Sequence, residues 1–190
     1  MARKSWTGLL GVMCSAAALF APGTARAEPP ITAGGIQLGL GFRYGFDFEE
    51  GDLNPWATGF GIEGGYTLPS AVYLGANLEY YLGSTVESLD TEVSSNVYQL
   101  SAEGGYDLGF AERFVLRPKV GVGLAGVRSE VCPEEGGCDS ESSSELLATP
   151  GVAFLFLGEH FSFSADVRYA VIFSDPEPLN GVLLTLGIGF

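Results

Sequence analysis

The chain has 190 residues and a formal net charge of −14 at pH 7, with 9 basic against 23 acidic side chains. This balance excludes nucleic-acid binding, which requires a basic surface. The length fits one domain, and no stretch offers the ~20 continuous apolar residues of a membrane-spanning helix.

The first residues predict an export signal. Arg3 and Lys4 precede a short apolar run over 9–20, and Ala25-Arg26-Ala27 supplies small residues for cleavage. We therefore expect residues 1–27 to be a signal peptide and residues 28–190 to be one barrel domain.

After this leader, large apolar residues recur at every second position, as in a β-strand whose two faces differ. The first such stretch, 35–48, alternates without exception between large apolar residues at even positions and glycine or polar residues at odd positions. Seven more follow, at 56–68, 71–82, 96–108, 114–127, 145–156, 161–173 and 181–190.

Long and short connections alternate between these stretches, and EGGYTL (63–68) is echoed by EGGYDL (103–108), which suggests repeated hairpins. Strands of about ten to fourteen residues can cross a bilayer when tilted. The pattern predicts an all-β fold: an eight-stranded antiparallel up-and-down transmembrane β-barrel with both termini periplasmic. The long connections 49–55, 84–95, 128–144 and 174–180 are then expected to be loops outside the cell.

The total volume of the apolar side chains decides which face of the strands lines the barrel interior. An eight-stranded barrel has room only for side chains or one small ligand, and most of the aromatic residues belong to the apolar set. That set should therefore face lipid. A soluble secreted ligand-binding barrel is the alternative, and it would partition into the periplasmic fraction. Aromatic girdles are expected near the outer edge (Phe46, Phe48, Trp56, Tyr80, Tyr98, Phe173) and the inner edge (Tyr66, Tyr106, Phe161, Phe190).

The inward face carries charges of both signs. A turn centred on Ala111 would place Glu103 opposite Lys119, and such pairing offsets the cost of burying charge. We interpret the set as a polar plug, with a charged conduit as the alternative. Pro118 and Pro150 cannot donate to the ladder, so a local bulge or irregularity is expected at each. The predicted lumen network is Arg43, Glu63, Glu79, Glu103, Arg117, Lys119, Asp166 and Arg168.

Over residues 35–190 the chain resembles the small eight-stranded outer-membrane barrels, namely the OmpA barrel domain and OmpX-like proteins. LRPKVGVGLA (116–125) resembles a typical strand of this group. The terminal alternation through Leu186, Ile188 and Phe190 resembles the signal that the barrel-assembly machinery reads. The resemblance implies the outer membrane of a bacterium, and we expect a monomer in contact with lipid and lipopolysaccharide. The peptidoglycan-anchoring half of OmpA is not expected after Phe190.

Catalysis, cofactors and metals are not predicted. Lipid-modifying barrels use a histidine near the outer rim. His160 falls in an expected periplasmic turn, and a general base on that side could not reach a substrate at the outer rim. Cys132 and Cys138 lie close together in a polar loop of an exported chain, which predicts a disulfide. Two cysteines are too few for a metal centre.

The predicted outer loops are strongly acidic. Solvation accounts for this, and weak binding of divalent cations, shared with lipopolysaccharide, is a hypothesis that no EF-hand spacing supports. We predict a structural or surface-interaction role for these loops. The alternative is a narrow pore or conduit for small solutes, whose conductance would be lost on mutating Arg117 or Lys119. The acidic residues are Glu49, Glu50, Asp52, Glu87, Asp90, Glu92, Glu130, Glu134, Glu135, Asp139, Glu141, Asp175 and Glu177.

Overall fold

The structure is a computed structural model that describes residue 32 and residues 34–48, 54–88, 91–133 and 138–190. The predicted signal peptide and several acidic loop residues (Glu49, Glu50, Asp52, Asp90, Glu134 and Glu135) lie outside these ranges. Within them, no helix is long and apolar enough to span a membrane.

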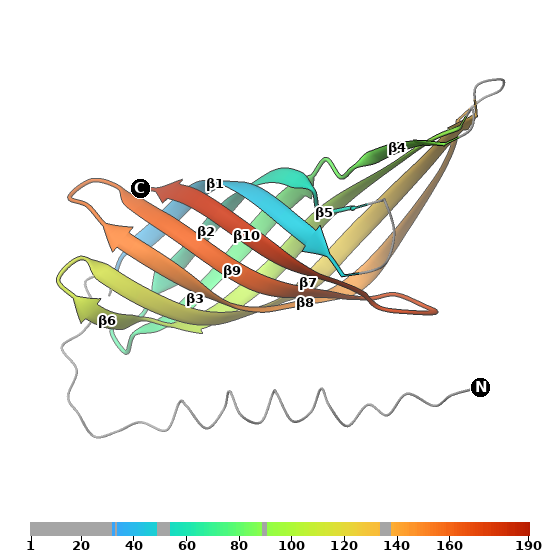
Figure 1. Cartoon of the computed structure of the whole chain (residues 1–190). Coiled ribbons are helices and arrows are strands. Elements are labelled where there is room, and N and C mark those ends of the chain that lie inside the picture. The colour runs from blue at the N-terminus through green and yellow to red at the C-terminus, as the bar shows by residue number, and fades with distance from the viewer. Residues whose placement is uncertain (1–31, 33, 49–53, 89–90, 134–137) are drawn as a thin grey trace.

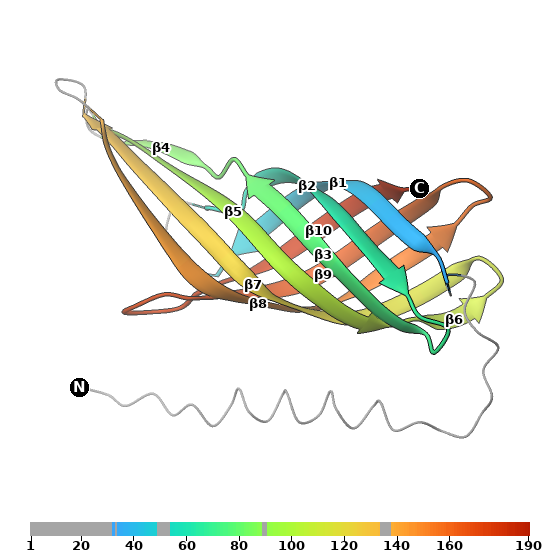
Figure 2. The same ribbon diagram turned by 180° about the vertical axis from the view of Figure 1, so that it is seen from behind.

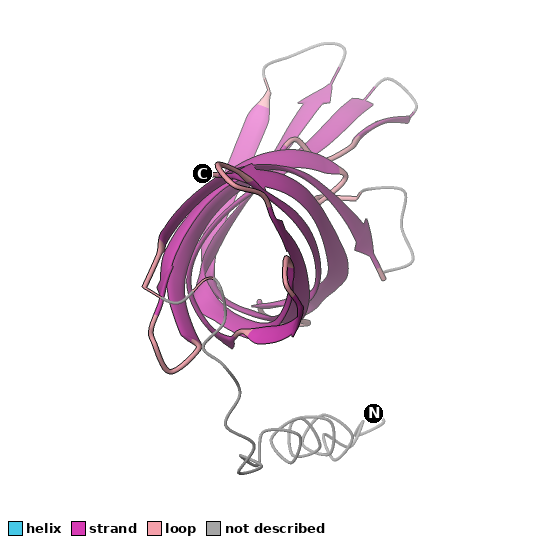
Figure 3. Ribbon diagram, turned by 90° about the vertical axis from the view of Figure 1, so that its left-hand side faces the viewer, coloured by secondary structure: helices cyan, strands magenta, loops and turns pink. Residues whose placement is uncertain are grey.

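The described residues form ten antiparallel strands that close into a barrel (Figures 1 and 3). The sheet runs from β5 through β3, β2, β1, β10, β9 and β8 to β7, and a further pairing of β5 with β7 closes the ring of eight. This confirms the predicted eight-stranded fold. The strands are β1 (Ile36–Asp47), β2 (Thr58–Thr67), β3 (Val72–Tyr81), β4 (Thr85–Ser88), β5 (Thr91–Tyr106), β6 (Leu108–Ala111), β7 (Phe114–Pro133), β8 (Asp139–Leu157), β9 (Ser162–Phe173) and β10 (Leu179–Gly189).

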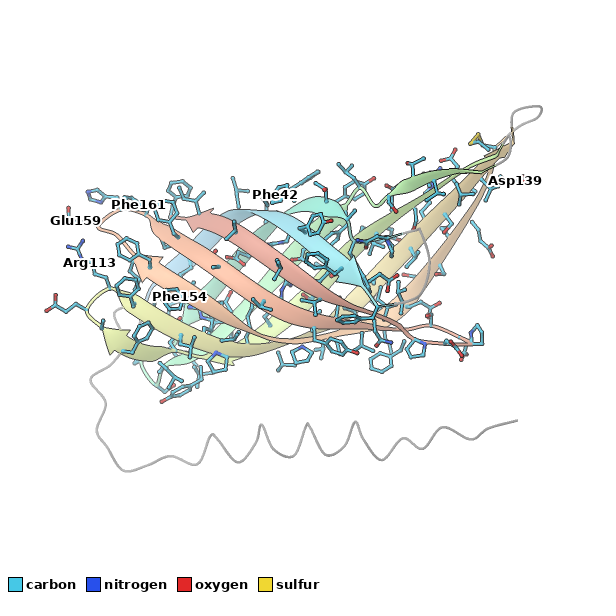
Figure 4. All side chains as sticks on the ribbon, in the orientation of Figure 1. Phe42, Arg113, Asp139, Phe154, Glu159 and Phe161 are labelled. Carbon is cyan, nitrogen blue, oxygen red and sulfur yellow. A yellow bond between two sulfur atoms is a disulfide. The ribbon has the colours of Figure 1, made fainter. Side chains whose placement is uncertain are left out.

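The two faces of the wall follow the sequence alternation. Phe42 is 56 % exposed while its neighbour Arg43 is 1 % exposed, and Leu186 is 67 % exposed while Thr185 is 2 % exposed. Figure 4 shows Phe42, Phe154 and Phe161 projecting from the barrel wall. The register aligns a continuous outward belt of apolar side chains around the strands: Ile188, Leu40, Ile62, Leu78, Leu100, Leu124, Leu146 and Phe173. An aqueous exterior would penalise this belt, whereas lipid favours it.

Part of the sheet continues well beyond one end of the barrel (Figures 1 and 2). This projecting sheet consists of β4 with residues 91–96 of β5, 128–133 of β7 and 139–145 of β8, joined by pairs such as Val93↔Val131 and Val131↔Asp139. The prediction of loops at 84–95 and 128–144 was therefore wrong. Both faces of a sheet outside the bilayer meet water, so these strands lack the alternation that marks the barrel.

The opposite end has short turns and the C-terminus (Figure 1). The β6–β7 turn is centred on Glu112, one residue later than predicted, after a register shift between Gly109 and Ala111. Lys119 consequently pairs with Gly105, and Glu103 pairs with Gly121, rather than with each other. Because the register moved by two residues, both side chains still face the lumen.

Each of the two strand prolines lies at a break in one of its ladders. Pairing of β7 passes from β5 at Lys119 to β6 at Leu116, leaving Pro118 between them. Pairing of β8 with β9 stops at Ala148 and resumes at Gly151, on either side of Pro150. The expected irregularities are present, as interruptions without a change of register, because proline only removes a donor.

Candidate functional site: the barrel interior and the projecting sheet

The middle of the lumen holds ion pairs contributed by strands on opposite walls. Glu79 on β3 receives Arg43 Nε at 2.6 Å from β1 and also contacts Arg168 Nη2 from β9. Three barrel strands separate β3 from β9 in either direction around the ring, so the Glu79–Arg168 pair crosses the full width of the lumen. All three side chains are buried, and Arg43 Nη2 also donates to Asn77 Oδ1 at 3.1 Å.

A second group of ion pairs continues this network. Lys119 Nζ lies 3.2 Å from Glu103 Oε2 and 2.5 Å from Asp166 Oδ2. Arg168 connects the two groups, because its Nε is 3.3 Å from Asp166 Oδ1 and its Nη1 is 3.7 Å from Glu103 Oε1. Positive and negative groups thus alternate from β1 to β7, and this alternation offsets the desolvation of each charge.

The third group lies toward the short-turn end and includes Asp107, which is missing from the predicted network. Arg117 donates to both oxygens of Asp107, at 2.6 and 2.9 Å, and to Gln37 Oε1 at 2.9 Å. Its guanidinium also stacks 3.7 Å from the centre of the Tyr73 ring. The echoed hexapeptides held a clue to Asp107: their inward positions 67 and 107 bind each other, with Thr67 Oγ1 donating to Asp107 Oδ2 at 3.0 Å.

Seven of the eight predicted network residues make ion pairs. Arg43, Glu79, Glu103, Arg117, Lys119, Asp166 and Arg168 do so. The eighth, Glu63, is half-buried between Gly39 and Asn77 on neighbouring strands and makes none of the ion pairs among the described residues. Gly39 leaves room for it, since an added β-carbon there would lie 3.0 Å from the Glu63 side chain.

An apolar layer fills the lumen near the projecting sheet. Its central member, Trp56, is fully buried, so its predicted place in the outer aromatic girdle is wrong. Trp56 lies before β2 begins, where strand alternation does not apply. Two glycines make room for its side chain: an added β-carbon at Gly45 would lie 2.4 Å from the Trp56 β-carbon, and one at Gly181 would lie 2.5 Å from the Trp56 ring. The other members are Tyr81, Val97, Ala125, Leu147, Ala170, Ile172 and Leu183.

The apolar layer is coupled to the ion pairs through Gln99. In the amide orientation that satisfies both neighbours, Gln99 accepts a hydrogen bond from Trp56 Nε1 at 2.8 Å and donates to Glu79 Oε2 at 3.1 Å. Tyr81 also donates to Glu79 Oε2, at 3.1 Å. The three bonds link the two layers into one buried unit, which fixes the geometry of the lumen at the end near the projecting sheet.

The last strand closes the barrel. The backbone of Phe190 exchanges hydrogen bonds with Leu38 of β1, at 2.8 and 3.2 Å. Leu186, Ile188 and Phe190 all point outward and are exposed. Their use as an assembly signal stays a prediction.

Cys132 and Cys138 form a disulfide near the tip of the projecting sheet, with Cα atoms 4.2 Å apart. Glu130 lies beside them, and the three side chains offer ligand atoms within 4.8 Å of one another. With both sulfurs in the disulfide, no thiolate is available to a metal ion. His160 is exposed in the β8–β9 turn, next to Glu159 at the short-turn end (Figure 4).

The disulfide is expected to stiffen only the tip. Thiol labelling of intact protein without reductant should leave Cys132 and Cys138 unmodified, and both should react after reduction. The Cys132→Ser/Cys138→Ser variant should keep the heat-modifiable gel mobility of a folded barrel, because the bridge closes a short loop far from the lumen. Labelling of both residues before reduction would contradict the bridge.

A closed ring with an apolar outer wall and charged interior defines a transmembrane β-barrel. The chain belongs to the outer membrane protein β-barrel domain family, whose model matches residues 7–190. It is therefore an outer-membrane barrel, as the resemblance implied. No curated protein sequence matches it.

Solved structures show the same fold at low sequence identity. Ail, the attachment invasion locus protein of Yersinia pestis, is 18 % identical, with a TM-score of 0.63 over 83 % of this chain and 97 % of Ail. A major outer membrane protein of Thermus thermophilus is 13 % identical, with a TM-score of 0.60 over 82 % and 99 %. The N-terminal barrel of Pseudomonas aeruginosa OprF is 19 % identical, with a TM-score of 0.52 over 81 % and 97 %.

Proposed function

We propose that this protein is a closed outer-membrane barrel that acts at the cell surface through its projecting sheet. The observation that carries the proposal is the difference in strand length. β7 has 20 residues and β8 has 19, whereas β1 and β9 have 12 each and β3 has 10. At ~3.4 Å per residue, residues 139–145 alone extend about 24 Å beyond the region that β9 covers.

The orientation in the membrane is part of the proposal. Residues 1–27 direct export and are removed, and both termini lie in the periplasm. The C-terminus is at the short-turn end (Figure 1), so the projecting sheet faces the environment. The barrel-assembly machinery reads Leu186, Ile188 and Phe190, and the mature monomer contacts lipid and lipopolysaccharide.

A closed lumen fits the described interior better than a pore does. The Glu79–Arg168 pair crosses the lumen, and the apolar layer around Trp56 lies beyond it. Moving ions past both layers would require breaking buried ion pairs and hydrating an apolar constriction, each of which is costly. These side chains therefore support a structural role for the network.

A surface-interaction role is also favoured over catalysis. The exposed His160 lies in a turn at the end opposite the projecting sheet, away from any substrate in the outer leaflet. Ail of Yersinia pestis has been crystallised in complex with the heparin analogue sucrose octasulfate. The projecting sheet of this chain presents Asp139 and Glu141 on its surface, and such carboxylates disfavour a sulfated ligand.

Shortening the projecting sheet tests the role directly. Asn-Gly turns replacing 86–93 and 129–141 keep the ladder pairs Thr85↔Ser94 and Arg128↔Ser142 in register, because two-residue turns close antiparallel hairpins. Bacteria expressing this variant should adhere to cultured-cell monolayers, and to one another, no better than bacteria lacking the protein.

The control for this experiment is the Cys132→Ser/Cys138→Ser variant, which keeps the strands and should keep adherence. Heat-modifiable mobility checks that each barrel folds. Equal adherence of the shortened and full-length proteins, or no adherence by the full-length protein, would overturn the surface-interaction role.

A further inference from the structure

One edge of the projecting sheet is unpaired. Residues 139–145 of β8 pair with β7, from Val131↔Asp139 to Ala125↔Glu145. On their other side, β9 begins to pair only at Leu146↔Phe173, so within the described part of the chain this edge has no neighbour. Alternate residues of such an edge direct free N–H and C=O groups outward, which another strand can pair with.

The same edge has two chemically distinct faces. Asp139, Glu141 and Glu145 lie on the face that continues the lumen side, and Ser140, Ser142 and Ser144 lie on the other. Residues 139–144 are exposed, with Asp139 near the far tip of the sheet (Figure 4). None of the three carboxylates forms an ion pair or hydrogen bond with any described residue.

The carboxylates beside this edge determine which charge a strand that pairs with it should carry. A second copy of this edge would place carboxylates beside carboxylates, and like charges on adjacent strands destabilise pairing. A strand with Lys or Arg at alternate positions would instead pair its cations with Asp139 and Glu141.

We propose that residues 139–145 bind a basic, extended segment of an extracellular protein as an added β-strand. The backbone of β8 supplies the hydrogen bonds, and the carboxylates of Asp139, Glu141 and Glu145 select the positive charge. This inference rests on the proposed surface role, and it names the class of partner.

The test uses the full-length protein in lipid nanodiscs and a fluorescent peptide of alternating Lys and Thr. Fluorescence anisotropy should show saturable binding that weakens as salt is added. The same peptide with every second amide N-methylated should bind at least about tenfold more weakly, because it cannot complete the ladder. An acidic peptide of alternating Glu and Thr should not bind.

Two charge-matched variants locate the site. Asp139→Asn/Glu141→Gln should weaken binding about fivefold, as expected for two exposed ion pairs. Asp175→Asn/Glu177→Gln removes the same charge from the exposed β9–β10 connection and should leave binding unchanged.

Equal losses in the two variants would show attraction to the overall negative charge and overturn the proposal. Equal binding of the N-methylated peptide would also overturn it. Failure of this test leaves the adherence experiment unaffected, since shortened and full-length proteins can still differ there through another partner. The two conclusions therefore fail separately.

Discussion

Replacing Glu79 by alanine is expected to lower the free energy of unfolding by about 3–5 kcal/mol, the cost of leaving a buried charge without its partner. Glu79 is the carboxylate shared by Arg43 and Arg168, and it also accepts hydrogen bonds from Asn77 and Tyr81. Its removal leaves two buried guanidinium groups facing each other. Urea unfolding in lipid vesicles, followed by tryptophan fluorescence, measures the effect.

The exposed Glu177 provides the control for this prediction. Glu177→Ala should change the unfolding free energy by less than about 0.5 kcal/mol, because surface substitutions away from packed features have small effects. A loss below about 1 kcal/mol for Glu79→Ala would mean that water or neighbouring carboxylates satisfy the arginines. The network would then not stabilise the barrel.

The second large effect is expected at Gly83, which joins β3 to β4. Its φ of +64° is strained for any residue with a β-carbon, and a β-carbon there would lie 1.6 Å from the Ser95 carbonyl oxygen. Gly83→Ala should therefore cost about 3 kcal/mol or more, since both strain and overlap with backbone must be relieved. Heat-modifiable mobility and urea unfolding report the loss.

Gly34 separates the effect of backbone strain from the effect of steric overlap. Its φ is +78°, but an added β-carbon meets nothing within 4 Å. Gly34→Ala should consequently cost only about 1–2 kcal/mol, the strain of a left-handed backbone. Similar losses at the two positions would mean that Ser95 moves away freely, and that the entry into the projecting sheet is not sterically fixed.

The barrel could be predicted from sequence because the bilayer imposes a contrast on every second residue. Phe42 and Arg43 are neighbours in sequence, yet one must suit lipid and the other a narrow polar interior. That contrast ends at the membrane surface. Residues 139–145 form part of β8 although DSESSSE has no apolar face, so their strand structure comes from pairing with β7.

The charged interior was predictable as a set of residues but not as a set of partners. The alternation of residues along each strand places Glu79 and Arg168 inside the barrel. Their contact, however, depends on the diameter of the closed ring. Asp107 has the same inward parity as Glu103, and it was missed because it lies at the end of the predicted strand 96–108, next to the turn. Trp56 was misplaced because it lies outside a strand. The direction of its side chain therefore depends on the path of the segment before β2 and not on strand alternation.

The sequence by itself determined the strand pattern within the barrel wall, the lipid-facing surface and most of the charged residues that line the lumen, because these follow from a local period of two. Only the tertiary structure decided which charges meet across the lumen, that Trp56 enters it, and that β8 leaves an edge unpaired. These features arise from contacts between distant segments, whose geometry is fixed only when β1 meets β10 and β5 meets β7.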